Sequence, residues 1–170
     1  MADYFAPTVI QQTIPNADMT ALERLVLGHI FDAEPDGDGP CFFGETGARD
    51  FVILPAAALR AAFAQPAGSA SCLRRHLAQA VASLDDTATD AEIDLSGMSW
   101  EFILQDIVRR SATLGYVTAV SAFTCSKMRP DGFGGMAILI TPDAIKGKST
   151  SDFLEELLAD INRADTALPA

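Results

Sequence analysis

The chain has 170 residues, 49% of them apolar, and a formal net charge of −11 from 23 acidic and 12 basic residues. A chain of this length buries roughly 70% of its unfolded surface on folding, so it does not need disulfides for stability. The acidic surplus argues against direct nucleic-acid binding, because contacts with phosphates depend on a basic surface. We predict a single domain that covers residues 1–170.

Cysteine content and hydropathy favour a cytoplasmic protein. Cys41, Cys72 and Cys125 are an odd number without a Cys-x-x-Cys pair, so neither a disulfide framework nor a four-cysteine zinc site is indicated. The chain starts without a basic segment followed by an apolar one, and no stretch offers the ~20 apolar residues of a membrane span. We therefore expect a reducing, cytoplasmic location and no membrane association.

The first predicted elements are a strand and an amphipathic helix. Alternating and β-branched residues from Thr8 to Ile14 favour a strand. Asn16 or Asp18 then caps a helix, because apolar side chains recur at the i, i+3, i+4, i+7 and i+8 positions of one face. The residues on this face, which we expect to be buried, are Leu22, Leu25, Val26, His29 and Ile30.

Two short strands and two helices follow in the predicted order. Turn residues from Asp36 to Pro40 precede the apolar runs Cys41–Phe43 and Phe51–Leu54, which we expect to pair with each other. Alanine-rich sequence then predicts a helix to about Gln65, and residues 66–71 break it. The next helix has an apolar face made by Leu73, Leu77, Ala80, Val81 and Leu84.

The second half of the chain gives the clearest pattern. Glu92–Leu95 favours a short edge strand, and Ser99 caps a helix whose apolar face carries Trp100, Ile103, Leu104, Ile107 and Val108. Strands Tyr116–Ser126 and Met136–Thr141 then form a long hairpin. A final helix, Asp152–Ile161, has an apolar stripe that we expect to be buried: Phe153, Leu154, Leu157, Leu158 and Ile161.

The order of these elements predicts the fold class. The best strands are joined as a hairpin, and the helices come singly and in pairs rather than between parallel strands. We therefore predict an α+β fold with an antiparallel or mixed sheet, built around the hairpin at about 116–141 and with helices packed on one face. The other face of the sheet is then available to a partner.

Two segments match part of a ligand-binding motif. Residues 142–149 end in Gly-Lys-Ser like a phosphate-binding P-loop, but Pro142 stands where that loop needs its first glycine. Residues 32–38 have the alternating acids of a calcium-binding EF-hand loop, but Phe43 replaces the bidentate glutamate at position twelve. We interpret the first as a surface loop and the second as an acidic turn, and we expect no metal or other cofactor.

The thiols and imidazoles do not form a catalytic signature. Cys72 and His76 are four residues apart on one predicted helix, where the two side chains can meet. Such a pair is half of a zinc site or half of an oriented nucleophile. The G-x-S-x-G and H-E-x-x-H motifs are absent from the sequence. We therefore assign no catalytic residue and expect structural roles for the cysteines.

The hairpin loop at residues 127–135 is the segment best suited to binding, because it combines Lys127, Arg129, Phe133 and three glycines. Glycines let a backbone approach a ligand closely, although a wide turn explains them as well. Arg109 and Arg110 end a helix, where cations complement its dipole. If the next strand folds back beside that helix, these arginines join Lys127 and Arg129 in a positive region suited to an anionic ligand.

The sequence leaves three classes of function open. The favoured one is a non-catalytic binding or protein-interaction domain, an accessory factor that docks on a larger partner or on itself as a homodimer. The second is a small-molecule-binding module or small enzyme that uses the 127–135 loop, with a carboxylate as general base. The third is an acidic nucleic-acid mimic, formed by the acidic blocks between Arg24 and Arg49 and between Arg75 and Arg109.

Overall fold

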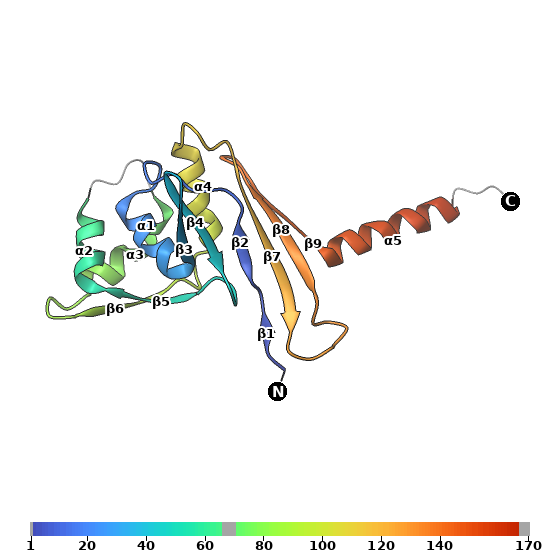
Figure 1. Ribbon diagram of the computed structural model, residues 1–170, viewed down its shortest axis with the longest axis horizontal. Helices are drawn as coiled ribbons and strands as arrows, with labels where there is room; N and C mark the ends of the chain where they lie inside the picture. The colour runs from blue at the N-terminus through green and yellow to red at the C-terminus, as the bar shows by residue number, and fades with distance from the viewer. Residues whose placement is uncertain (1, 66–70, 167–170) are drawn as a thin grey trace.

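Five helices and nine strands form the part of the chain that the computed structural model describes, residues 2–65 and 71–166 (Figure 1). The break predicted at residues 66–71 lies, apart from Ser71, outside these residues. Seven strands form one antiparallel sheet and two strands form a second, smaller antiparallel sheet. The predicted α+β class is confirmed.

The elements have the following bounds. The helices are α1 (Ala21–Ile30), α2 (Ala56–Ala64), α3 (Cys72–Ala82), α4 (Trp100–Arg110) and α5 (Thr150–Thr166). The larger sheet contains β1 (Tyr4–Phe5), β2 (Thr8–Ile10), β3 (Asp32–Asp36), β4 (Gly39–Gly44), β7 (Val117–Cys125), β8 (Gly134–Ile140) and β9 (Ile145–Ser149). The smaller sheet contains β5 (Phe51–Pro55) and β6 (Asp90–Asp94).

The predicted hairpin is the centre of the larger sheet. The strand order is β3-β4-β2-β7-β8-β9, and β1 pairs with β7 beyond the end of β2. β7 and β8 pair from Val117 opposite Ile140 to Phe123 opposite Gly134. The valines, the threonines and Phe123 of β7 favour this extended conformation, because such side chains pack well on a pleated surface.

Three predictions about strands and loops are wrong. The runs 41–43 and 51–54 do not pair with each other, since β4 lies between β3 and β2 and β5 pairs with β6. The supposed acidic turn at 32–36 is strand β3, and Gly37, with a φ of 61°, supplies the tight turn into β4. The supposed surface loop at 145–149 is strand β9. Hydrogen bonds to a neighbouring strand hold both segments extended.

Helices α1 to α4 lie on one side of the larger sheet (Figure 1), with α4 against β7 and β8 and α1 against β3 and β4. Side chains alternate along a strand. In β7, Val117, Ala119 and Ser121 are therefore buried towards the helices, whereas Val120 and Ala122 are exposed on the opposite side. We call these sides the inner face and the outer face. The prediction of helices on one face holds for α1 to α4.

A capping box starts α1. The Oγ1 atom of Thr20 accepts from the backbone N–H of Glu23 at 3.2 Å, and a carboxylate oxygen of Glu23 accepts from the N–H of Thr20 at 2.9 Å. The helix thus begins after the predicted caps, Asn16 and Asp18. His29, which we expected on the buried stripe, is half-buried, and the buried positions are Leu22, Glu23, Val26, Leu27 and Ile30.

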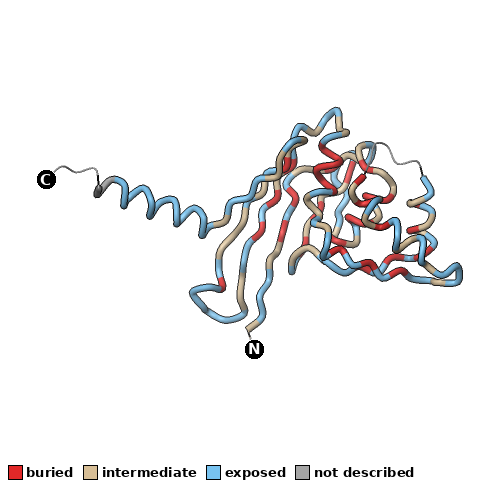
Figure 2. The backbone as a smooth tube through the Cα atoms, turned by 180° about the vertical axis from the view of Figure 1, so that it is seen from behind, coloured by how far each residue is buried: buried red, intermediate tan, exposed pale blue. Residues whose placement is uncertain are grey.

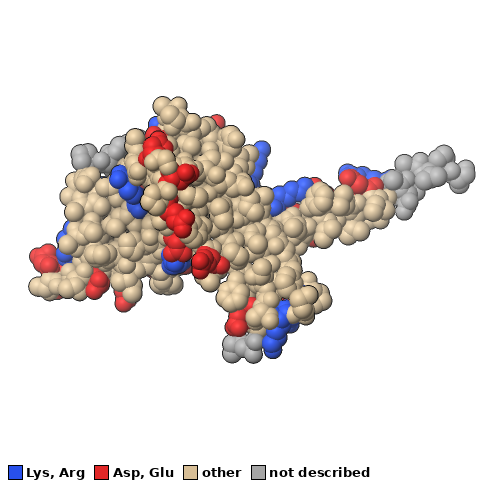
Figure 3. Space-filling model, viewed as in Figure 1, with Lys and Arg blue, Asp and Glu red and all other residues tan. Residues whose placement is uncertain are grey.

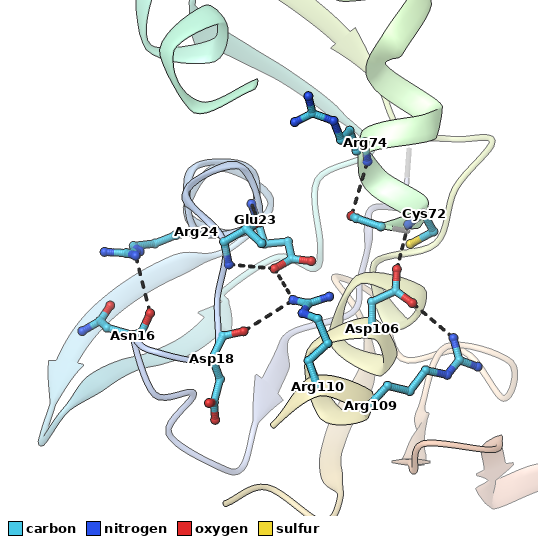
Figure 4. A network of polar contacts seen from close by, with 11 residues as sticks. Asn16, Asp18, Glu23, Arg24, Cys72, Arg74, Asp106, Arg109 and Arg110 are labelled. Atoms are coloured by element: carbon cyan, nitrogen blue, oxygen red, sulfur yellow. Dashed lines mark hydrogen bonds and ion pairs between the residues drawn. The ribbon is translucent and has the colours of Figure 1, made fainter. Parts of the chain in front are cut away.

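A buried ion pair joins α1 to α4 (Figure 4). The Glu23 side chain is fully buried, and its Oε2 atom accepts from Arg110 at 2.6 Å. Arg110 also donates to the carbonyl of Asp18 at 3.4 Å. The other carboxylate oxygen of Glu23 has no hydrogen-bond partner among the described residues. One carboxylate therefore caps α1 and holds the end of α4, which places α1 against the sheet.

We expect Glu23→Ala to lower the free energy of unfolding by about 3 kcal/mol, because it leaves Arg110 without its buried partner and removes half of the capping box. Urea denaturation followed by circular dichroism measures this loss. Asp32→Ala is the matched control: it breaks the exposed Asp32–Arg49 pair and should cost less than ~1 kcal/mol. Equal losses for the two variants would contradict the structural role of Glu23.

Candidate interaction surface

The apolar stripe of α5 is exposed, which corrects the prediction that it is buried. The helix projects from the sheet on the side opposite α1 to α4 (Figure 1), and its residues from Thr150 to Arg163 are exposed (Figure 2). The large apolar side chains of the stripe are each between 43% and 60% exposed. They are Phe153, Leu154, Leu157, Leu158 and Ile161. Periodicity predicted this helix correctly but does not specify what covers its face.

Polar contacts fix the point at which α5 leaves the sheet. The N–H and hydroxyl of Ser149 donate to a carboxylate oxygen of Asp152 at 2.8 and 2.7 Å, and the N–H of Asp152 donates to the Ser149 hydroxyl at 3.1 Å. These bonds from Ser149 lower the pKa of the Asp152 carboxyl. Thr150 accepts from the N–H of Gly135 at 3.2 Å. The first turn of α5 is therefore attached to both β9 and β8.

The outer face of the sheet continues the apolar surface of α5. Its exposed apolar side chains are Val9, Val120, Ala122, Ala137 and Leu139. A shallow groove of about 370 Å³, which we call the outer groove, lies between this face and the start of α5. Its lining includes Val120, Ala137, Lys148 and Phe153. The ammonium group of Lys148 lies 5.3 Å from the centre of the Phe153 ring, so the groove has one cationic wall.

The structure separates the predicted site residues into two groups. Arg109 donates to the carbonyl of Pro142 at 2.7 Å, just after β8 ends, and Arg110 pairs with Glu23. Lys127, Arg129 and Phe133 lie in the exposed loop before β8 begins. The seven residues of β8 span about 20 Å, so the two groups stand at opposite ends of that strand. The positive region that would join them is not formed.

The loop does contribute to a second groove, of about 550 Å³, on the inner face. We call it the inner groove, and its lining includes Tyr4, Thr8, Trp100, Glu101, Ser121, Phe123, Asp131 and Met136. Burial raises the pKa of the Glu101 carboxyl, and the charge of Asp50 acts in the same direction. Glu101 and Asp131 give this groove two carboxyl groups, which favour a neutral or cationic ligand over the anionic ligand that the loop suggested.

The two acidic blocks lie on separate sheets. The first includes Asp32, Glu34 and Asp36 on alternate positions of β3, and Figure 3 shows acidic side chains gathered over this strand. The second includes Asp90, Glu92 and Asp94, which are exposed on alternate positions of β6. Each block therefore supplies one short row of carboxylates. The nucleic-acid mimic stays a prediction.

Cys72 and His76 have separate partners in the structure. The backbone N–H of Cys72 donates to Asp106 at 2.7 Å, whereas the Nε2 atom of His76 contacts the carbonyl of Asp94 at 2.9 Å. Burial and, to a smaller extent, the nearby carboxylate of Asp106 together raise the pKa of the Cys72 thiol to about 12. A thiol with this pKa is protonated at neutral pH and is a poor nucleophile.

The described residues contain no group of three or more His, Cys, Asp or Glu that could hold a metal ion. None of their helices combines the length and the apolar character that a membrane crossing requires. No family model, curated protein or solved structure matches the chain. The contacts and surfaces described above are therefore the basis for any functional proposal.

We expect alkylation of Cys72 at pH 9 to be at least about 50-fold slower in the folded protein than in urea, since an unfolded thiol has a pKa near 8.5 and is largely thiolate at that pH. Peptide mass spectrometry after iodoacetamide treatment measures both rates. The folded rate should rise with pH up to about 12. Equal rates in the two states would contradict the placement of the thiol beside Asp106.

Proposed function

We propose that this chain is a non-catalytic protein-interaction domain and that α5 is its docking element. The observation that carries the proposal is the exposed apolar stripe on a helix that projects away from the body (Figure 2). Contiguous apolar surface of this kind marks interaction sites in soluble proteins, because water contact with it costs free energy that a partner removes. Because hydrogen bonds attach the first turn of α5 to β8 and β9, the helix leaves the sheet in a fixed direction, which supports docking from a defined side.

The width of the stripe supports a flat partner surface. In heptad terms, Leu154, Leu157 and Ile161 occupy a and d positions, and Phe153 and Leu158 fill the flanking g and e positions. A stripe of this width extends beyond the narrow seam of a two-helix coiled coil. It is suited to a sheet face or to a groove between two elements.

The surroundings of the histidines support a non-catalytic role. The ring nitrogens of His29 and His76 contact the backbone carbonyls of Leu25 and Asp94, at 2.8 and 2.9 Å. One ring nitrogen of each imidazole is therefore held by a backbone carbonyl, and among the described residues neither ring is hydrogen-bonded to a serine, threonine or cysteine side chain. The hydroxyl of Ser121, in the inner groove, is bonded at 2.7 Å to a neighbouring threonine hydroxyl. These groups have structural partners.

Leu158→Glu should remove the bound partner, because it places a charge within the apolar stripe. Ala159→Glu is the matched control, since it adds the same charge to the opposite side of the same helix. The measurement is native mass spectrometry of the tagged full chain purified gently from its own cells. We expect a stoichiometric protein chain, a different protein or a second copy, to be retained by the wild type and A159E and lost from L158E.

Two outcomes would contradict this proposal. Retention of the same partner by L158E would show that α5 is not the docking element. A retained small molecule in place of a protein chain would favour the ligand-binding alternative and the inner groove. Circular dichroism of L158E and A159E checks that both variants keep the wild-type fold, which the exposure of both positions leads us to expect.

A further inference from the structure

Two rows of side chains cross the outer face from an acidic edge to a basic edge. The register places Asp32 of β3 at one end of the first row and Lys148 of β9 at the other, with Phe43, Val9, Val120 and Ala137 between them. The second row runs from Glu34 to Lys146 by way of Cys41, Thr118 and Leu139, with Gln11 beside Thr118. The face is therefore acidic along β3 and basic along β9, and its centre is apolar in the first row and polar at Gln11 and Thr118 in the second.

A surface with this charge order is complementary to a second copy of itself. A two-fold axis parallel to the strands, midway between two facing sheets, reverses the direction of each row. The β3 edge of one copy then faces the β9 edge of the other, so that carboxylates meet ammonium groups at both ends and apolar side chains meet in the centre. Such complementarity fixes the relative orientation of two partners.

The side chains of Glu34 and Lys146 have no hydrogen-bond or ion-pair partner among the described residues, whereas their backbones pair within the sheet. Asp32 and Lys148 pair within the chain, with Arg49 and Glu156, but these pairs are exposed and contribute little stability. The second row therefore ends in two charges that the isolated chain leaves unused. In the face-to-face arrangement, Glu34 of each copy lies opposite Lys146 of the other.

The area of the apolar surface also favours a contact larger than α5 alone. The exposed part of the α5 stripe amounts to on the order of 500 Å², whereas a stable interface uses about 800 Å² from each partner. The outer face supplies apolar surface of the same order, from Val9, Val120 and Leu139 and the alanines beside them. Together the two surfaces reach the size of a stable interface.

We propose that the protein partner is a second copy of this chain, which docks outer face to outer face and makes two symmetric Glu34–Lys146 ion pairs. α5 starts at the β9 edge on the outer side. In this dimer it therefore runs alongside the β3 edge of the other copy, which covers the apolar stripe. This inference rests on the proposed function of α5 and adds the identity of the partner and the orientation of the contact.

The test is a charge exchange, measured by sedimentation velocity of the full chain. The wild type should be a dimer. Lys146→Glu and Glu34→Lys should each raise the dissociation constant of the dimer at least ~10-fold, because each places like charges at both symmetric contacts. The double variant E34K/K146E restores opposite charges and should return to within ~3-fold of the wild type. Arg75→Glu makes the same charge change on α3, on the opposite side of the sheet, and should have no effect.

Other results would overturn the inference. A wild-type monomer at about 100 µM, a dimer that ignores both single changes, or a double variant that does not recover would each reject the face-to-face contact. The proposed function is tested separately by L158E. Suppose that the wild type sediments as a monomer and retains a different protein chain, which L158E loses. Then α5 docks on that other protein, and the proposal that the partner is a second copy is wrong. If L158E loses nothing, the proposed function itself is wrong.

Discussion

Strand β7 determines where every other surface of the molecule lies, because both of its edges are hydrogen-bonded and its two faces have different environments. β2 and β1 pair along one edge and β8 along the other. Its inner side chains, Val117 and Ala119, are buried, and α4 packs against the strand. The inner groove lies where β7 extends past the helices, and the outer face is the reverse side of the same strand.

The cap at Ser149 and Asp152 determines the direction of α5, and this direction leaves the stripe exposed. The helix starts beside the outer face, so stripe and face form one apolar surface with carboxylates along β3 and lysines along β9. Long-range repulsion opposes the association of two chains that each carry a net charge of −11, and salt screens it. Local charge order at the contact then decides which orientation is stable.

Local patterns in the sequence predict the elements that bury an apolar face, and they miss features that depend on distant residues. The hairpin and the α4 stripe follow from β-branched content and helical spacing. β3 and β9 were missed because Asp32, Glu34 and Lys146 have no strand pattern and are held by neighbouring strands. The burial of Glu23 depends on Arg110, 87 residues away. The rows of the outer face require the register of six strands, which no local motif encodes.

Hydrogen–deuterium exchange of α5 as a function of protein concentration distinguishes a docked helix from one that stays exposed to solvent. An exposed helix attached at one end opens easily, so its amides should exchange quickly in the dilute chain. If α5 docks on a second copy, exchange in residues 150–163 should slow at least ~10-fold between about 1 µM and about 100 µM protein, while exchange in peptides from α4 should not change. Equally rapid exchange of α5 at both concentrations would contradict the docking of this helix on a second copy.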